Sequence, residues 1–245
     1  MSFLSKIPIF GVNIHPQPDM QIIRVLTSRR LIVLIALAFS IMPMLKAQVF
    51  YSDPYEGYAE ETFMDMDFEP NLATPPVPDT EKSAVRAYME ALARTVKGPF
   101  AVDLMRNGEV MVVTIPADRL FLPNDTIVAD GAEKVFDPVR RLMQEPYRFK
   151  IVLAMHTDDT GNELYRERLS TQRLYSIYDM MLDDIDNGDI NGDIVIIPFA
   201  LGSSDPITDN DSWRHRAENR RLEIYFIPGP ELIKMAHEGK MPPLY

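Results

Sequence analysis

Short apolar runs alternate with segments of helical periodicity between residues 82 and 227, and this alternation limits the chain to folds that combine a sheet with helices. Apolar spacing predicts helices over 82–96, 132–143, 165–182 and 213–217. Runs of strand length lie at 149–155, 194–201 and 221–227, and Asn107-Gly108 predicts a tight hairpin turn within 101–115. We therefore predict an α+β fold, a βαβαβ-type sandwich with helices packed on a mixed sheet, preceded by a helix and a hairpin strand.

The first fifty residues predict an export segment. Leu31 to Leu45 carries no charge, follows Arg29-Arg30 and precedes the small residue Ala47. This run is shorter than the roughly 20 residues of a spanning helix, and Pro43 interrupts its end. Residues 1–47 are thus predicted to be a cleaved secretory signal, and Met20 is the predicted true start of the protein. An uncleaved signal-anchor is the alternative.

Residues 48–81 are acidic and rich in proline. They contain nine Asp or Glu, five Pro and no Lys or Arg. Charge repulsion and fixed proline dihedrals favour an extended chain, so this segment is predicted to be a linker. The remaining segments are then an amphipathic helix over 82–100, the folded domain over 101–228 and a peripheral tail over 229–245.

Composition excludes several classes of function. The formal net charge is −11, from 25 basic and 36 acidic residues, and such a surface repels nucleic acid. The absence of cysteine excludes zinc-thiolate sites, thiol nucleophiles and lipoprotein acylation. The sequence also lacks the Gly-x-Ser-x-Gly and Gly-x-x-x-x-Gly-Lys patterns of hydrolases and phosphate-binding loops.

Three motifs carry the functional information. The run HTDDTG at 156–161 directly follows a buried strand, and LSTQR at 169–173 lies on the next helix. ADRLFLPNDT at 117–126 precedes them, and RAENRRLEI at 216–224 follows them. In this order and spacing the motifs resemble the OmpA-like (OmpA/MotB) peptidoglycan-binding domain family over roughly residues 110–227.

That resemblance implies a non-catalytic protein that binds the diaminopimelate of uncrosslinked stem peptides in the cell wall. It assigns Asp158 to the ligand's ammonium and Arg173 to its carboxylate, a pairing that suits a zwitterion. Asn124 and Thr160 would add hydrogen bonds, and Arg220 is a weaker candidate. No metal or cofactor is implied.

The same resemblance implies a place in the periplasm or envelope of a bacterium with two membranes, with outer-membrane association as an option. Peptidoglycan is the expected partner, and other envelope proteins would bind through the linker or the amino-terminal helix. Nucleic acid is not expected, and a membrane is expected only if the signal stays uncleaved.

Three positions depart from the family pattern. The family usually has Gly before the His, Asn three residues ahead of the Leu-Ser pair and Ala after the Arg, whereas this chain has Met155, Arg166 and Leu174. Arg166 is expected to contact a peptide carboxylate, but it cannot both donate and accept as an amide does. An envelope scaffold that has lost wall binding is therefore an alternative function.

A metal-dependent hydrolase is a less favoured alternative. It would use His156, Asp158 and Asp159 as ligands, with His215 as a further candidate. Adjacent carboxylates at a strand end point to opposite sides, which opposes a shared metal. We expect His156 instead to fix the loop by a hydrogen bond from its ring to the backbone.

Two further alternatives lack an essential group. The segment 187–193 imitates the start of an EF-hand loop, but Pro198 occupies the twelfth position, where a bidentate Glu is needed. A Gly-rich acidic turn is expected there. A proton-driven stator needs an ionisable residue within its membrane segment, and Leu31 to Leu45 contains none.

Overall fold

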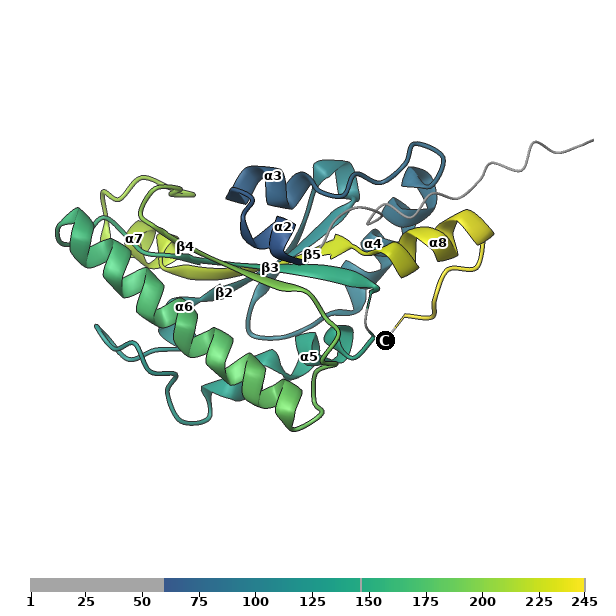
Figure 1. Ribbon diagram of the computed structural model, residues 1–245. Helices are drawn as coiled ribbons and strands as arrows, with labels where there is room; N and C mark the ends of the chain where they lie inside the picture. The colour runs from purple at the N-terminus through teal and green to yellow at the C-terminus, as the bar shows by residue number, and fades with distance from the viewer. Residues whose placement is uncertain (1–59, 146, 245) are drawn as a thin grey trace, which may run out of the picture. The chain divides into compact units, whose positions relative to one another are not determined.

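The computed structural model describes residues 60–145 and 147–244, so the predicted export segment lies outside the described residues. Five strands form one mixed sheet in the order β1-β2-β5-β3-β4 (Figure 1). β3 pairs with β4 in parallel, and the other three pairings are antiparallel. The strands are β1 (Ala101–Met105), β2 (Val110–Pro116), β3 (Phe149–His156), β4 (Ile196–Gly202) and β5 (Arg221–Pro228).

Helices lie on both faces of this sheet, as Figure 1 shows for α2 and α3 above it and α6 below it. The α-helices are α2 (Glu60–Met64), α3 (Phe68–Ala73), α4 (Lys82–Thr95), α5 (Asp137–Arg140), α6 (Glu163–Asp186), α7 (Trp213–Asn219) and α8 (Pro230–Glu238). Across 60–145 and 147–244, none of the helices combines the length and the apolar character that crossing a membrane requires. The predicted α+β class, with helices on a mixed sheet, is confirmed.

The central strand β3 supplies the core on both faces of the sheet. Ile151, Leu153 and Met155 pack with α4, α6 and α8, whereas Val152 and Ala154 face α2 and α3. All eight β3 residues are buried. This explains why the strand is continuously apolar instead of alternating with polar residues.

The hairpin forms where the Asn-Gly pair predicts it. β1 and β2 pair from Met105↔Val110 onward, and Asn107 and Gly108 have φ of 57° and 92°. A short 3₁₀ turn, η1 (Arg106–Gly108), makes the connection. Positive φ is accessible to Asn and Gly at little cost, which is why this dipeptide marks the turn.

The prediction of an extended linker is wrong for residues 60–81. This part forms α2 and α3, and its apolar side chains Phe63, Leu72 and Val77 are buried. Phe63 and Leu72 pack with Val110, Val112 and neighbouring residues on the second face of the sheet. Burial of that apolar surface outweighs the charge repulsion that composition suggested.

A buried lysine ties α3 to the sheet. Lys150 on β3 is buried, and its Nζ donates to Asn71 O at 2.6 Å, to Asn71 Oδ1 at 2.8 Å and to Thr74 O. The same Nζ lies 4.3 Å from the centre of the Phe63 ring. Burial, with a smaller contribution from Arg106, lowers the pKa of Lys150 to about 7. Three acceptors thus satisfy the three donors of one ammonium group.

Two other predicted segments differ from the structure. Residues 132–143 form not one helix but three short pieces, η3 (Ala132–Phe136), α5 and η4 (Arg141–Met143), with Pro138 at the start of α5. Residues after 228 are not a peripheral tail, because α8 buries Leu232 and Ile233 in the core beside α4.

Candidate ligand-binding pocket

Sheet topology brings three chain segments together at one end of the domain. β2 and β3 each pair antiparallel with β5, so both run in the same direction and end beside the start of β5. Pro116 pairs with Arg221, and Met155 pairs with Leu222. The loop after β2, the loop after β3 and the turn before β5 therefore meet at this end, where α6 begins.

A pocket of about 480 Å³ lies among these segments. All five residues that the sequence analysis selected line it, namely Asn124, Asp158, Thr160, Arg173 and Arg220. The rest of the lining is Asp118, Phe121, Leu122, Pro123, Thr157, Tyr165 and Leu169. Spacing alone did not require Asp158 and Arg173 to converge, but the fold brings both to the same pocket.

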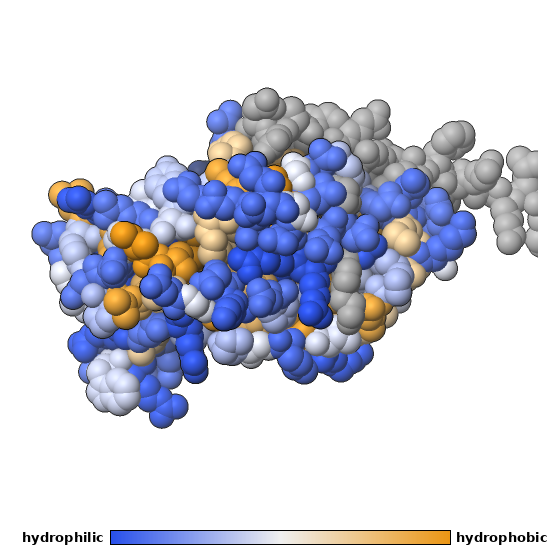
Figure 2. All heavy atoms as spheres, turned by 90° about the horizontal axis from the view of Figure 1, so that it is seen from below, coloured by the Kyte–Doolittle hydropathy of each residue, from blue (hydrophilic) through white to orange (hydrophobic). Residues whose placement is uncertain are grey.

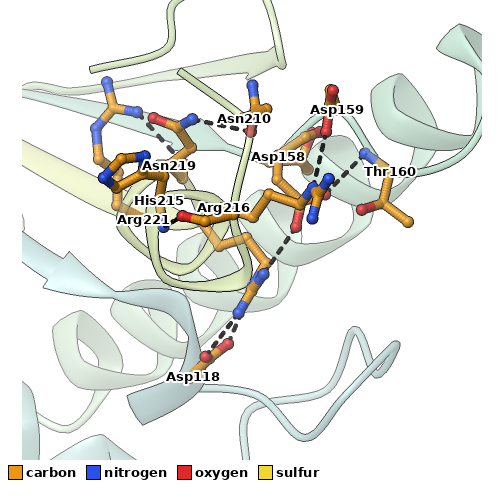
Figure 3. Close-up of polar contacts among 12 residues, drawn as sticks. Asp118, Asp158, Asp159, Thr160, Asn210, His215, Arg216, Asn219 and Arg221 are labelled. Carbon is orange, nitrogen blue, oxygen red and sulfur yellow. Dashed lines mark hydrogen bonds and ion pairs between the residues drawn. The ribbon is translucent and has the colours of Figure 1, made fainter. Parts of the chain in front are cut away.

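An ion-pair triad forms one side of the pocket (Figure 3). Arg220 donates from Nη1 to Asp158 Oδ2 at 2.7 Å and from Nη2 to Asp118 Oδ2 at 3.0 Å. Its Nε donates to Asp118 Oδ1 at 3.3 Å, so Asp118 holds the guanidinium with both oxygens. Asp118 thus fixes the position of Arg220, and Arg220 in turn holds Asp158.

Asp158 is held in its ionised form. Its Oδ1 accepts a hydrogen bond from the backbone N of Thr160 at 2.9 Å. Although burial opposes ionisation, the hydrogen bonds from Arg220 and Thr160 hold the pKa of Asp158 below its usual range. A carboxylate is therefore available in the pocket at neutral pH.

The pocket lining also includes a cation with no carboxylate at ion-pair distance. Arg173 is 4% exposed, and its Nε donates to the backbone O of Asp125 at 2.8 Å. Its guanidinium lies 4.8 Å from the centre of the Phe121 ring. No ion pair joins Arg173 to another residue of the described chain. Burial lowers the pKa of Arg173, but a guanidinium stays charged at any physiological pH.

The charged side chains of the pocket sum to zero. Asp118 and Asp158 contribute two negative charges, and Arg173 and Arg220 contribute two positive ones. Arg220 is paired with both carboxylates, whereas Arg173 does not join the triad and forms no ion pair with a described residue. The arrangement is suited to a small ligand that carries both an ammonium and a carboxylate.

Sequence reasoning missed three of the lining residues that shape the site. Asp118 orients Arg220, Phe121 supports Arg173, and the hydroxyl of Tyr165 donates to Asn124 Oδ1 at 3.2 Å. Asp118 and Phe121 lie inside the quoted 117–126 motif, which was the available signal. Tyr165 had no such signal, since its contact spans 41 residues of sequence.

The start of α6 explains where Tyr165 lies. The helix begins at Glu163, earlier than the apolar periodicity indicates, because Asn162 Oδ1 accepts a hydrogen bond from the backbone N of Tyr165 at 2.8 Å. Gly161, with φ of 84°, turns the chain into this cap. Tyr165 is thereby placed on the first turn, at the pocket.

None of the three departures from the family pattern lies in the pocket lining. Met155 and Leu174 are core residues. Arg166 braces the loop after β3, since its Nη1 donates to Asp159 O at 3.1 Å and to Gly161 O at 2.7 Å. The expectation that Arg166 reaches a ligand carboxylate finds no support in this geometry.

The candidate metal ligands of the hydrolase alternative each contact a different residue. His156 Nε2 lies 3.1 Å from Glu223 Oε2, Asp158 pairs with Arg220, and Asp159 pairs with Arg216 at 3.3 Å. Figure 3 shows Asp158 and Asp159 engaged with separate arginines. Among the described residues, no three His, Asp or Glu side chains form a group that could hold a metal ion. The expectation that His156 bonds the backbone is wrong, because its partner is a carboxylate.

The acidic segment after α6 is a turn. Asn191 Oδ1 accepts a hydrogen bond from the backbone N of Asp193 at 2.9 Å, and Gly188 has φ of 80°. Both features are typical of Asx and Gly turns, as expected for 187–193.

A buried charge network on β5 centres on Glu223, three residues after the pocket residue Arg220. Glu223 accepts hydrogen bonds from Arg221 Nε at 2.8 Å and from Tyr225 OH at 2.5 Å, in addition to its contact with His156. Although burial opposes ionisation, His156, Tyr225 and Arg221 lower the pKa of Glu223 to about 2. The network links the end of β3 to the start of β5, the two segments that present Asp158 and Arg220.

This network predicts acid sensitivity of the fold. The pKa of Glu223 is below its ordinary value of 4.5 in the folded state, so its contribution to stability is complete above pH 4.5 and is lost as pH falls toward 2. We expect the free energy of unfolding, measured by urea titration, to decline through this window. Glu223→Gln should be less stable at pH 7 and should show a shallower decline; an unchanged slope would contradict the assignment.

Sequence relatives agree with the motifs. No protein-family model matches the chain. The chain is 24% identical over 140 residues to the probable lipoprotein YiaD of Escherichia coli, covering 57% of this chain and 61% of that protein. It is 31% identical over 70 residues to outer membrane porin F of Pseudomonas aeruginosa, covering 28% of this chain and 18% of that protein. The chain thus spans about three fifths of the first relative and less than a fifth of the second.

Solved structures with a similar fold include a putative MotB-like protein from Desulfovibrio vulgaris, with 22% identity, a TM-score of 0.47, and coverage of 60% of this chain and 92% of that one. The cell wall anchor of the type VI secretion system from Pseudomonas aeruginosa is 21% identical, with a TM-score of 0.44. The match covers 58% of this chain and 96% of that one. The assignment itself rests on the motifs and the sequence relatives. On that basis the folded part of the chain is similar to OmpA/MotB-like domains.

Proposed function

We propose that this domain binds peptidoglycan without covalent attachment, through the diaminopimelate of uncrosslinked stem peptides, and thereby anchors an envelope protein or complex to the cell wall. In this proposal residues 101–228 are the binding domain, and 1–47 are the export signal or anchor. The site is in the periplasm of a bacterium with two membranes.

The observation that carries the proposal is the buried, unpaired Arg173. Burying a cation is costly unless an anion accompanies it, and no carboxylate of the described residues lies within 4.0 Å of Arg173. The guanidinium presents two parallel N–H donors, which match a carboxylate in a bidentate geometry. A ligand carboxylate would supply the missing partner.

Asp158 would take the ammonium of the same amino acid group. One of its oxygens already accepts from Arg220 and the other from Thr160, but a carboxylate has about four acceptor sites. An ammonium can therefore be added while the triad stays in place. Asn124 and the Tyr165 hydroxyl, which meet on the pocket wall, would supply polar contacts to the attached peptide.

Removal of the Asp158 charge tests the carboxylate side of this proposal. Asp158→Asn keeps the shape of the side chain but removes the ammonium partner, so retention of the full-length protein by insoluble peptidoglycan in a pelleting assay should be lost. Asp159→Asn is the matched control, because Asp159 is adjacent and half exposed and is outside the pocket lining. Equal pelleting of wild type and Asp158→Asn would overturn the assignment.

The second candidate function is the envelope scaffold that has lost wall binding. The observation that favours it is the use of Arg166 to brace a loop where the family has an amide. A scaffold predicts no pelleting of the wild-type protein. Cross-linking would then recover a protein partner.

A further inference from the structure

The outward face of α6 carries a line of side chains that contact nothing in the core. At 3.6 residues per turn, six positions fall within about 60° of one another on the helix. We refer to them as the outer stripe, which consists of Leu164, Arg168, Tyr175, Asp179, Leu182 and Asp186. The buried residues of α6, such as Leu174, Ile177 and Met181, lie on the other side of the helix.

The apolar members of the outer stripe are exposed. Leu164 is 73% exposed, Tyr175 is 57% exposed and Leu182 is 42% exposed. Figure 2 shows the side of the molecule on which α6 lies, with apolar side chains among the hydrophilic ones. A surface helix normally places polar residues on this face, so three large apolar side chains in one line indicate a contact surface.

The charges of the outer stripe are ordered against the helix dipole. Arg168 is the charged stripe residue nearest the amino-terminal end of α6, where negative charge is favoured. Asp179, Asp183 and Asp186 lie in its last two turns, and the last turn contains no basic residue. Neither Arg168 nor Asp179 forms an ion pair with another residue in the described ranges. Within one helix, this order of stripe charges is unfavourable.

We propose that the outer stripe binds the same stripe of a second copy of this chain, with the two α6 helices antiparallel. If a twofold axis perpendicular to the helices passes at the height of Arg173 along α6, Leu164 lies opposite Leu182 of the second copy. Arg168 then lies within one residue, about 1.5 Å along the axis, of the level of Asp179 of the second copy. Each contact occurs twice, and Arg168 of each helix meets the acidic carboxyl-terminal part of the other.

The spacing of the stripe fits this pairing. Arg168, Tyr175 and Leu182 are seven residues apart, the repeat that keeps one seam in contact when two helices cross at about 20°. From Leu164 to Leu182 the seam is about 27 Å long at 1.5 Å per residue. Antiparallel alignment also places the two helix dipoles in opposite directions, which is the favourable arrangement.

Charge reversal tests the pairing in the full-length chain by sedimentation velocity. Arg168→Asp should raise the dimer dissociation constant at least about tenfold, because two attractive contacts become repulsive. Asp179→Arg should do the same, and the double variant should recover the wild-type value. Arg94→Asp, an exposed charge change on α4, is the matched control. A monomeric wild type at all concentrations, or no rescue by the double variant, would overturn the proposal.

Cysteine cross-linking tests the direction of the helices. The chain has no cysteine, so engineered thiols are the only ones present. A mixture of Leu164→Cys and Leu182→Cys chains should give disulfide-linked heterodimers under mild oxidation, whereas each variant alone should not. Cross-linking of Leu164→Cys with itself would mean a parallel pair and would contradict the proposal.

Discussion

Replacing Arg173 by glutamine is expected to abolish retention of the protein by insoluble peptidoglycan. The wild-type guanidinium is buried without a carboxylate partner, so a ligand carboxylate would form a desolvated charge pair with it. Truncating one partner of such a pair costs about 2–5 kcal/mol, or at least about 30-fold in affinity. The pelleting assay measures this loss directly, and titration of the soluble protein with a stem peptide gives its magnitude.

The same substitution should leave the fold intact. Arg173 makes one hydrogen bond, to Asp125 O, and removing an uncompensated buried cation offsets the loss of that bond. The circular dichroism spectrum and the cooperative unfolding transition should therefore persist. Arg214→Gln, at a highly exposed position on α7, is the control for loss of a positive charge. Wild-type pelleting by Arg173→Gln would exclude this residue from the site.

Replacing Phe63 by alanine is expected to lower the free energy of unfolding by about 3–5 kcal/mol, the usual cost of removing a buried aromatic ring. Phe63 is 1% exposed, packs on the second face of the sheet and lies against the Lys150 ammonium. Its loss would leave a cavity beside a buried charge. Urea titration of the full-length chain measures the change.

The neighbouring residue provides the control for this prediction. Met64 is 52% exposed on the same short helix, so Met64→Ala should change the free energy of unfolding by less than about 0.5 kcal/mol. Similar small effects for both substitutions would mean that α2 does not contribute to the domain core, and residues 60–81 would then be the linker that composition suggested.

Local sequence patterns predicted the elements whose causes are local. Asn107-Gly108 marks the hairpin between β1 and β2, because Asn and Gly adopt positive φ at lower cost than other residues. The continuous apolar character of 149–155 indicated a strand buried on both faces, and β3 has that environment. Helical periodicity indicated α4 and α6, although capping by Asn162 moves the start of α6 ahead of the apolar pattern.

The missed features depend on contacts between residues far apart in the sequence. α3 is held by a hydrogen bond from Lys150 to Asn71, which are 79 residues apart, and acidic composition gave no hint of it. Arg220 reaches Asp118 across 102 residues and Asp158 across 62. Spacing cannot predict such pairs, and only the order of the motifs indicated that these loops share a site.

The central claim is that the pocket recognises an amino acid group carrying both charges, and two peptide ligands test it most directly. Lysine differs from diaminopimelate by lacking the side-chain carboxylate. In calorimetric titrations of the full-length chain, a stem peptide with diaminopimelate should bind at least about 30-fold more tightly than the lysine-containing peptide. Arg173→Gln should remove most of this difference. Equal affinity of the wild-type protein for the two peptides, or binding of neither, would contradict the proposed site.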